Sequence, residues 1–347
     1  MLLFWINIGK INNKNIFTIQ LELSSDCNLR CIHCYHDTPK ITDSSLETNL
    51  VFKQIDELKT NLKIDTLKLH LSGGEPFLLR NLREVLVKIR NYETTIITNG
   101  TLIDKLMIFR LIFVSLPVIQ ISLDSSESCI HDYIRGEGVF NLVMESINNL
   151  NKYGFILTIS TVLLKGINDN NFEKLFQLCM NKGIKAINFS RFFPQGRSKN
   201  LDKYTFTDGR EYKKVLQNLI KAASKFPELI IIIKDPLINN LSNLPSNIEK
   251  DICCYIGDNF LSIDSKGNVY ACRKLGIVIG NLYEQTLTQI WRNSKKLKEL
   301  IDRSEYIHKK CTKCHNFIKC KGGCLAAALN YKNSKKLFNS DPGCWIL

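Results

Sequence analysis

Three cysteines with short spacing stand near the start of the chain, in the segment SDCNLRCIHCY. Cys27, Cys31 and Cys34 are separated by three and two residues, and no fourth cysteine follows nearby. Zinc sites and iron–sulfur clusters that only stabilise a fold normally take four protein ligands. Three thiolates can instead hold a four-iron cluster by three of its corners, which leaves one iron with an exchangeable position. The spacing therefore predicts a cluster with one iron available for chemistry.

A structural zinc site is the alternative for this segment. It would combine the three cysteines with His33 or His36. Zinc motifs usually pair two cysteines with a second, distant pair of ligands, so we favour the cluster. Two cysteines, Cys129 and Cys179, stand apart from every group of cysteines, and the pattern around Cys179 is typical of a small helical core residue.

Other segments with chemically useful residues follow later predicted strands. LSGGEPF begins at Leu71, QISLDSSES begins at Gln120, and HDYIRG begins at His131. In parallel strand–helix folds, sites are built on the loops at the carboxyl ends of the strands. We therefore expect these segments and the three cysteines to share one face of the sheet.

The elements that must position these segments alternate between strands and amphipathic helices from Ile16 onward. The predicted strands are 16–23, 65–71, 94–98, 118–123, 155–164 and 185–190, and the predicted helices between them are 46–62, 81–92, 103–114, 139–153 and 171–181. Six strand–helix units imply parallel strands joined by right-handed crossovers. The predicted fold class is α/β, a partial (β/α)6 TIM-like barrel with a small cysteine-rich C-terminal domain.

The character of the sequence changes after a predicted helix at 211–225 and a predicted strand at 228–234. We expect a short N-terminal extension at 1–15, a core at 16–235, an Asn-, Pro- and Ser-rich linker at 236–250 and a cysteine-rich domain at 251–347. In that last domain, FLSIDSKGNVYAC predicts a hairpin around Lys266 and Gly267. IGNLYEQTLTQIW predicts a bridging loop and helix. Eight of the thirteen cysteines lie between Cys253 and Cys344.

On these motifs the chain resembles the radical S-adenosylmethionine (SAM) enzymes, whose signature is cysteine, three residues, cysteine, two residues, cysteine. The resemblance spans nearly the whole chain and implies that SAM supplies the missing ligand, through its amino and carboxylate groups. It further implies that one electron splits SAM to a 5′-deoxyadenosyl radical, which takes a hydrogen atom from the substrate. In such enzymes the cofactor carries the chemistry and the protein supplies the geometry.

The resemblance also implies which residues contact SAM. Glu75, with the glycines before it, would bind the amino group, Ser122 the ribose or carboxylate region, and Arg135 the carboxylate. Alternatives are a surface position for Arg135 at a helix end and a role for Asp124 on the substrate side. The segment 98–100 would shape the adenine pocket. The full set of implied SAM contacts is His33, Gly73, Gly74, Glu75, Ser122, Arg135 and Val162, with His33 and Val162 near the adenine; no catalytic base is identified.

The late cysteines resemble the seven-cysteine pattern of the SPASM extension, an auxiliary-cluster domain. The family's ligation implies one cluster on Cys254, Cys272 and Cys324 and another on Cys311, Cys314, Cys320 and Cys344. The first set is one ligand short. Either Cys253 is the fourth ligand, or one iron stays open to water or substrate; the two possibilities are equal. A zinc ribbon on Cys311 and Cys314 is the alternative. The implied cofactors are SAM and three 4Fe–4S clusters, one that binds SAM and two auxiliary clusters that carry electrons or bind substrate.

Composition narrows the choice of partners. The chain of 347 residues has 47 Lys and Arg against 33 Asp and Glu, a formal charge of +14. Aromatic residues are not interleaved with the late lysines, so we do not expect nucleic acid as a partner. The charge suits an acidic substrate, and the alternative is an ordinary solvated surface. The N-terminus is a poor signal peptide, and Leu106–Leu123 is interrupted by Arg110 and Pro117, so we expect a cytoplasmic protein without a membrane partner.

The leading functional hypothesis is the maturation of a ribosomally made peptide or small protein by crosslinking, thioether formation, epimerisation or oxidation. The leader of the peptide would then bind a separate protein or the basic surface of the chain itself, and an electron donor such as flavodoxin or ferredoxin is expected. A sulfatase-maturase type dehydrogenase is one alternative, although those enzymes carry an acidic base after the second auxiliary cysteine, where this chain has Arg273. A tetrapyrrole-tailoring enzyme is another. A structural metal-binding module is the non-enzymatic alternative.

Overall fold

The computed structural model describes residues 15–36, 46–113, 117–250, 254–302, 308–330 and 341–346. These residues form two compact units whose segments alternate along the chain. The first unit contains 15–28, 46–113, 117–120 and 255–302 of the described residues, and the second contains the rest. Cys27 therefore belongs to the first unit, whereas Cys31 and Cys34 belong to the second.

A mixed sheet forms the centre of the first unit. β1 pairs in parallel with β2 on one side and with β9 on the other, and β2 pairs in parallel with β3. β10 pairs antiparallel with both β9 and β11, so the predicted hairpin is confirmed and extends the parallel sheet. The strands are β1 (Ile16–Glu22), β2 (Thr66–Ser72), β3 (Glu93–Thr98), β9 (Phe260–Ile263), β10 (Asn268–Tyr270) and β11 (Val278–Asn281).

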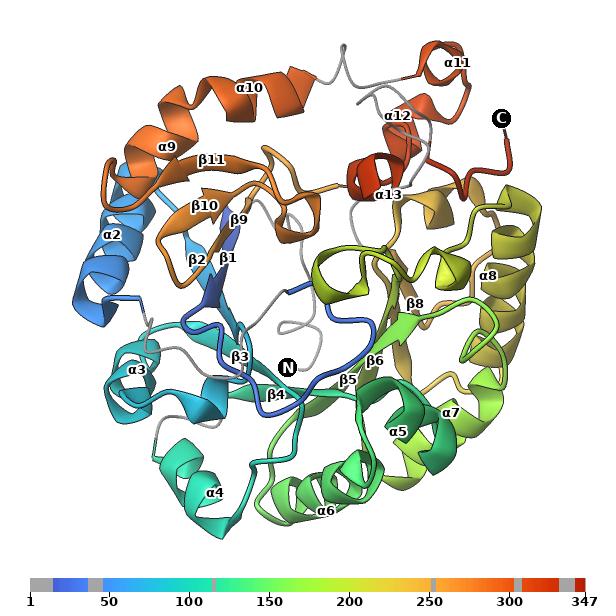
Figure 1. The fold of residues 1–347 in the computed structure, drawn as a ribbon, viewed down its shortest axis with the longest axis horizontal. Coiled ribbons are helices and arrows are strands. Elements are labelled where there is room, and N and C mark those ends of the chain that lie inside the picture. The colour runs from blue at the N-terminus through green and yellow to red at the C-terminus, as the bar shows by residue number, and fades with distance from the viewer. Residues whose placement is uncertain are drawn as a thin grey trace. The chain divides into compact units, whose positions relative to one another are not determined.

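Helices cover one face of this sheet. Along β1, Ile19 and Leu21 are fully buried, and Ile55 and Leu58 of α2 (Thr48–Asn61) are buried as well. Because side chains alternate along a strand, Glu22 lies on the opposite face from Leu21. Figure 1 shows α2 beyond β1 and β2, with α9 packed beside it. The helices of this unit are α2 (Thr48–Asn61), α3 (Leu82–Ile89), α4 (Lys105–Ile112), α9 (Leu287–Asn293) and α10 (Lys295–Asp302).

The second unit contains a parallel sheet in the order β5, β6, β7, β8. Its strands are β5 (Leu157–Leu163), β6 (Ala186–Arg191), β7 (Ile230–Ile233) and β8 (Ile248–Lys250). Figure 1 shows α6, α7 and α8 outside these strands. The helices are α5 (Ser128–Arg135), α6 (Val139–Lys152), α7 (Phe172–Asn181), α8 (Gly209–Ala223), α11 (Lys309–Thr312), α12 (Phe317–Cys320) and α13 (Leu325–Asn330). β4 (Val118–Ser122) runs from the first unit into the second.

The structure confirms the strand–helix alternation and adds four elements that the sequence reasoning missed. α5 follows β4 directly, and β11 begins the segment expected to be a bridging loop. The segment expected to be a linker contains a short helix, η4 (Pro236–Asn240), and β8, which pairs with β7. The domain boundaries stay a prediction, and residues 1–14 and 251–253 lie outside the described residues. Within the described part of the chain, no helix is long and apolar enough to span a membrane.

Candidate functional site

The glycine loop after β2 packs on the backbone that leads to Cys27. Gly73 has a φ of +127°, a conformation that residues with a Cβ rarely adopt. A Cβ on Gly74 would overlap the carbonyl group of Asp26. The amide of Gly74 donates to Ser24 O at 2.9 Å and the amide of Glu75 donates to Asp26 O at 2.6 Å. The bare backbone expected to approach a ligand therefore also holds the loop before the first cysteine.

Glu75 is a buried carboxylate without a described counter-ion. Its Oε1 accepts from Thr98 Oγ1 at 2.7 Å, and its Oε2 accepts from the amide of Asn99 at 2.8 Å. Burial raises the pKa of Glu75 to about 7, although these two hydrogen bonds act in the opposite direction. A buried carboxylate without a partner cation favours binding of a positively charged ligand group. The residue therefore fits the amino group of SAM.

The turn after β3 supports the first cysteine. Asn99 Nδ2 donates to Cys27 Sγ at 3.9 Å and to Asn28 Oδ1 at 2.9 Å. Asn28 Nδ2 in turn donates to Thr101 Oγ1 at 2.8 Å. An N–H group that points at a sulfur stabilises the thiolate form that binds iron. The sequence reasoning assigned this segment to the adenine pocket and missed the contact with Cys27, which the shared strand end could have suggested.

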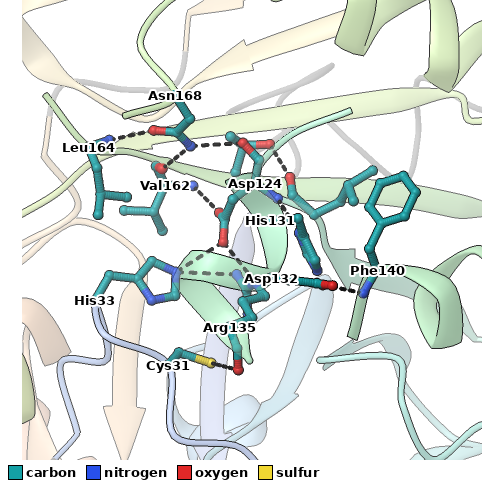
Figure 2. Close-up of polar contacts among 12 residues, drawn as sticks. Cys31, His33, Asp124, His131, Asp132, Arg135, Phe140, Val162, Leu164 and Asn168 are labelled. Carbon is teal, nitrogen blue, oxygen red and sulfur yellow. Dashed lines mark hydrogen bonds and ion pairs between the residues drawn. The ribbon is translucent and has the colours of Figure 1, made fainter. Parts of the chain in front are cut away.

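In the second unit, Asp124 is the centre of a buried polar cluster (Figure 2). Its Oδ2 accepts from Arg135 Nε at 2.7 Å and lies 3.3 Å from His33 Nε2. Its Oδ1 accepts from the amide of Val162 at 2.9 Å. Burial acts to raise the pKa of Asp124, but the charges of Arg135 and His33 outweigh it and hold that pKa well below its usual range. Asp124 is therefore an anion that fixes the side chains of Arg135 and His33.

The backbone of Asp124 is held as firmly as its carboxylate. Its amide donates to His131 Nδ1 at 3.2 Å, and its carbonyl accepts from Asn168 Nδ2 at 2.8 Å. Burial, followed by the charge of Arg135, lowers the pKa of His131 to about 4, so this ring is neutral at pH 7. A neutral ring can accept at Nδ1 only if its proton is on Nε2. The loop after β4 is thus fixed from α5 and from the loop after β5.

The carboxyl end of α5 anchors the loop of the last two signature cysteines. The thiol of Cys31 lies 3.9 Å from Arg135 O, and the amide of Ile32 donates to Ile134 O at 2.9 Å. Arg135 NH2 also lies 3.3 Å from His33 Nε2. Arg135 is only 7% exposed, so the surface-capping alternative is wrong. Both oxygens of Asp124 are engaged and its side chain is fully buried; its role on the substrate side stays a prediction.

Ser122 and Val162, the two remaining candidates, lie at or near the carboxyl ends of β4 and β5. Ser122 is the last residue of β4 and is half-buried, and its hydroxyl makes no hydrogen bond to any described residue. Val162 packs beside a buried cluster of Ile134, Leu164, Phe192 and Tyr204. Their contacts with SAM stay predictions, as do those of His33, Gly73, Gly74, Glu75 and Arg135.

The structure gathers the second auxiliary set of cysteines. Burial raises the pKa of Cys311 to about 11, and the nearby thiols of Cys344, Cys320 and Cys314 add to the effect. Four clustered thiols in one unit fit a four-iron cluster, whose positive irons would reverse that shift. Among the described residues, no group of three or more His, Cys, Asp or Glu could hold a single metal ion. A four-iron cluster spans a wider site than one ion.

The first auxiliary set is divided between the units. Cys254 and Cys324 belong to the second unit and Cys272 to the first. Cys253 lies outside the described residues. The ligands of this cluster, and the total number of clusters, therefore stay predictions.

Comparisons with known families match both halves of the chain. The radical SAM superfamily profile matches residues 21–179, and the iron–sulfur cluster-binding SPASM domain matches residues 253–315. These two domains imply SAM and 4Fe–4S clusters as cofactors.

Relatives of known name align over most of the chain. The mycofactocin maturase MftC of Mycolicibacterium smegmatis is 25% identical over 331 residues, which cover 93% of this chain and 81% of that protein. The AdoMet-dependent heme synthase of Methanosarcina barkeri is 27% identical over 349 residues, with coverages of 94% and 95%.

Solved structures share the fold. Native anSMEcpe with bound AdoMet and Kp18Cys peptide has a TM-score of 0.74 at 22% identity and covers 95% of this chain and 94% of that one. Streptococcus suis SuiB bound to S-adenosylmethionine has a TM-score of 0.73 at 19% identity, with coverages of 95% and 77%. The predicted α/β fold class, an unclosed partial barrel with a C-terminal cluster domain, is confirmed. The chain therefore belongs to the radical SAM superfamily, as an enzyme with a C-terminal SPASM domain.

Proposed function

We propose that this enzyme cleaves SAM reductively and modifies a peptide or small protein. Two of the structures that share its fold hold peptides: SuiB is bound to the precursor peptide SuiA, and anSMEcpe to the Cp18Cys peptide. MftC is named as a maturase. A flavodoxin or ferredoxin would supply the electron, and the leader of the substrate would bind a separate protein or the basic surface of this chain.

The residues of this chain bind and orient the cofactor. Cys27, Cys31 and Cys34 would hold the cluster, and only six residues separate the first from the last, so the chain itself keeps them near one another. When bound, SAM supplies a 5′-deoxyadenosyl radical that removes a hydrogen atom from the substrate. The observation that carries the proposal is the buried Glu75, which has two occupied oxygens but no described cation and would receive the SAM ammonium group.

Arg135 would bind the carboxylate group of SAM. Its Nε donates to Asp124, and one terminal nitrogen lies near His33. A guanidinium has five N–H donors, so others remain for a carboxylate. Asp124 would act as a positioning residue because it fixes the plane of the Arg135 guanidinium.

A tetrapyrrole substrate is the second candidate. The heme synthase from Methanosarcina barkeri aligns over 95% of its length, and the charge of +14 suits a substrate rich in carboxylates. The sulfatase-maturase alternative is weakened by Arg273, whose Nε donates to Glu22 Oε2 at 2.8 Å and whose guanidinium lies over the ring of Tyr270. Arg273, paired with Glu22 of β1, thus occupies the position where a sulfatase-maturase type enzyme is expected to carry an acidic base.

The test combines cofactor cleavage with substrate modification. Protein reconstituted anaerobically with iron and sulfide is reduced with dithionite in the presence of SAM, and 5′-deoxyadenosine is measured by chromatography and mass spectrometry. We expect cleavage in the parent chain and none in Cys31→Ala. Candidate peptides encoded beside the gene and a carboxylate-bearing porphyrin are then offered in separate reactions. A mass change only in the porphyrin would overturn the peptide proposal, and no 5′-deoxyadenosine at all would overturn the radical chemistry.

A further inference from the structure

Arg191, the last residue of β6, forms a buried charge network far from the signature cysteines in sequence. Its NH1 and NH2 donate to the two carboxylate oxygens of Asp341 at 2.8 and 2.6 Å. Its Nε lies 2.9 Å from Asp235 Oδ2, which also accepts from Tyr212 OH at 2.9 Å. The side chains of Arg191, Asp235 and Asp341 are each at most 2% exposed. Every member belongs to the second unit.

The Asp341 carboxylate also holds the backbone of two segments that carry cysteines. Oδ2 accepts from the amide of Cys324 at 2.8 Å, and Oδ1 accepts from the amide of Gly343 at 2.9 Å. The amide of Cys344 donates to the carbonyl of Asp341 at 3.0 Å. Through its carboxylate and its backbone carbonyl, Asp341 thus contacts a proposed ligand from each auxiliary set, and its carboxylate also holds the residue before Cys344. With two donors on each oxygen, Asp341 itself is unsuited to bind iron.

Close packing leaves this segment little freedom. A Cβ added to Gly343 would overlap Arg191 NH1, and one added to Gly209 at the start of α8 would overlap the carbonyl of Cys344. A Cβ on Gly323 would come too close to the Asp341 side chain. The tight contacts at these three glycines therefore restrict where Cys324 and Cys344 can lie.

We propose that Asp341, clamped by Arg191, is a positioning residue that presents Cys324 and Cys344 for iron binding before any cluster is assembled. This inference rests on the proposed auxiliary ligation. Groups that orient metal ligands typically contribute 10- to 100-fold to metal affinity. The bidentate contact is what a guanidinium provides and an ammonium group does not.

A matched pair of variants separates positioning from general stability. Asp341→Asn and Asp235→Asn each remove one negative charge beside the same buried Arg191, and each turns an amide group toward existing donors. Of these two carboxylates, only that of Asp341 hydrogen-bonds a cysteine segment within the described part of the chain, whereas Asp235 accepts from the amide of Leu237 in η4. We therefore expect both variants to lower the free energy of unfolding of the iron-free chain, but only Asp341→Asn to weaken iron binding.

The measurement is the release of iron to a ferrous chelator from anaerobically reconstituted protein, followed over time. Asp341→Asn should release the iron of the late cysteines about 10- to 100-fold faster than the parent chain. Asp235→Asn should stay near the parent rate. Arg191→Lys, which keeps the buried charge but loses the fork, should fall between them and serves if Asp341→Asn does not fold.

Two results would overturn the inference, and they differ from a failure of the ligation itself. Equal release rates in the two Asn variants would make Asp341 merely structural, and an unchanged rate in Asp341→Asn would remove its role. Cys344→Ala is the control for ligation, because it should hold less iron than the parent. If it holds the same amount, the proposed ligation fails, whatever the Asp341 variants do.

Discussion

Two buried carboxylates of the candidate site have opposite electrostatic surroundings. Glu75 accepts only neutral donors among the described residues, and burial raises its pKa to about 7. Asp124 is buried as deeply, yet the charges of Arg135 and His33 keep its pKa well below the usual range. One carboxylate thus has a cation already, whereas the other has none among the described residues and would gain one from the SAM ammonium group. This contrast separates the residue expected to touch SAM from the residue expected to position Arg135.

The pH dependence of stability should report the unpaired state of Glu75. Its folded pKa of about 7 lies above the ordinary value of 4.5, so the folded chain binds an extra proton between those values. The free energy of unfolding therefore falls as the pH rises through that window, by up to roughly 3 kcal/mol. Urea unfolding of the protein without SAM at pH 5 and pH 8 measures this, and Glu75→Gln should remove this part of the pH dependence. Identical pH profiles in the two chains would contradict it.

Asp124 and Arg135 should show strong thermodynamic coupling. Removal of one partner from a buried ion pair leaves an uncompensated charge and costs about 3–5 kcal/mol. Asp124→Asn and Arg135→Met should therefore each destabilise the iron-free chain by that amount, while the double variant should lose less than the sum. Urea unfolding of the four proteins gives the coupling free energy. Additive losses would show that the pair is not the unit that holds the loop after β4.

At the scale of elements, short helices and long-range contacts explain what the sequence did not predict. The segment SCIHDYIR of α5 makes about two turns, too few for the apolar period to be recognised, yet it carries both His131 and Arg135. The contact of Arg191 with Asp341 joins residues 150 positions apart, and no local pattern signals it. The ligand roles of the cysteines rest on their spacing and on the family resemblance, and they stay predictions.

The glycine loop offers a prediction at this scale. Ala at Gly74 would force away the backbone of Asp26, which directly precedes Cys27. We expect Gly74→Ala to lower iron retention at the signature cysteines and to abolish SAM cleavage. Gly154→Ala is the matched control: its φ of +76° makes Ala strained, but an added Cβ meets nothing within 4 Å. That variant should lose only about 1 kcal/mol of stability and keep its iron. Equal iron loss in both variants would assign the effect to strain alone.

At the scale of the whole molecule, the alternation of strand and helix patterns predicted the elements of the core. It did not predict which strands from distant parts of the chain pair with that core. The hairpin of β9 and β10 was predicted from its turn, whereas its parallel pairing with β1 joins segments more than two hundred residues apart. The sequence also gave no sign that the described chain divides into two units whose segments alternate. Local patterns specify elements, and the partner of an edge strand depends on packing that no short window contains.

The net charge gives a prediction that bears on the substrate. Three exposed lysines, Lys309, Lys310 and Lys313, flank the cysteines at 311 and 314 in the second unit. Charges at the surface attract an anionic substrate over about one Debye length, and salt screens that attraction. We expect the association rate of a carboxylate-bearing porphyrin or an acidic peptide to fall at least about tenfold between roughly 20 and 500 mM salt, as measured by stopped-flow fluorescence.

Local and global charge can be separated with two triple variants. Replacement of Lys309, Lys310 and Lys313 by Gln should reduce the salt dependence if the substrate approaches the late cysteines. The same change at three exposed lysines elsewhere, Lys53, Lys105 and Lys152, removes an equal charge from the molecule. Because screened charges act only over a short range, this control should keep most of the salt dependence. Equal effects of the two triple variants would mean that net charge alone steers the substrate, and a salt-independent rate would exclude an anionic substrate.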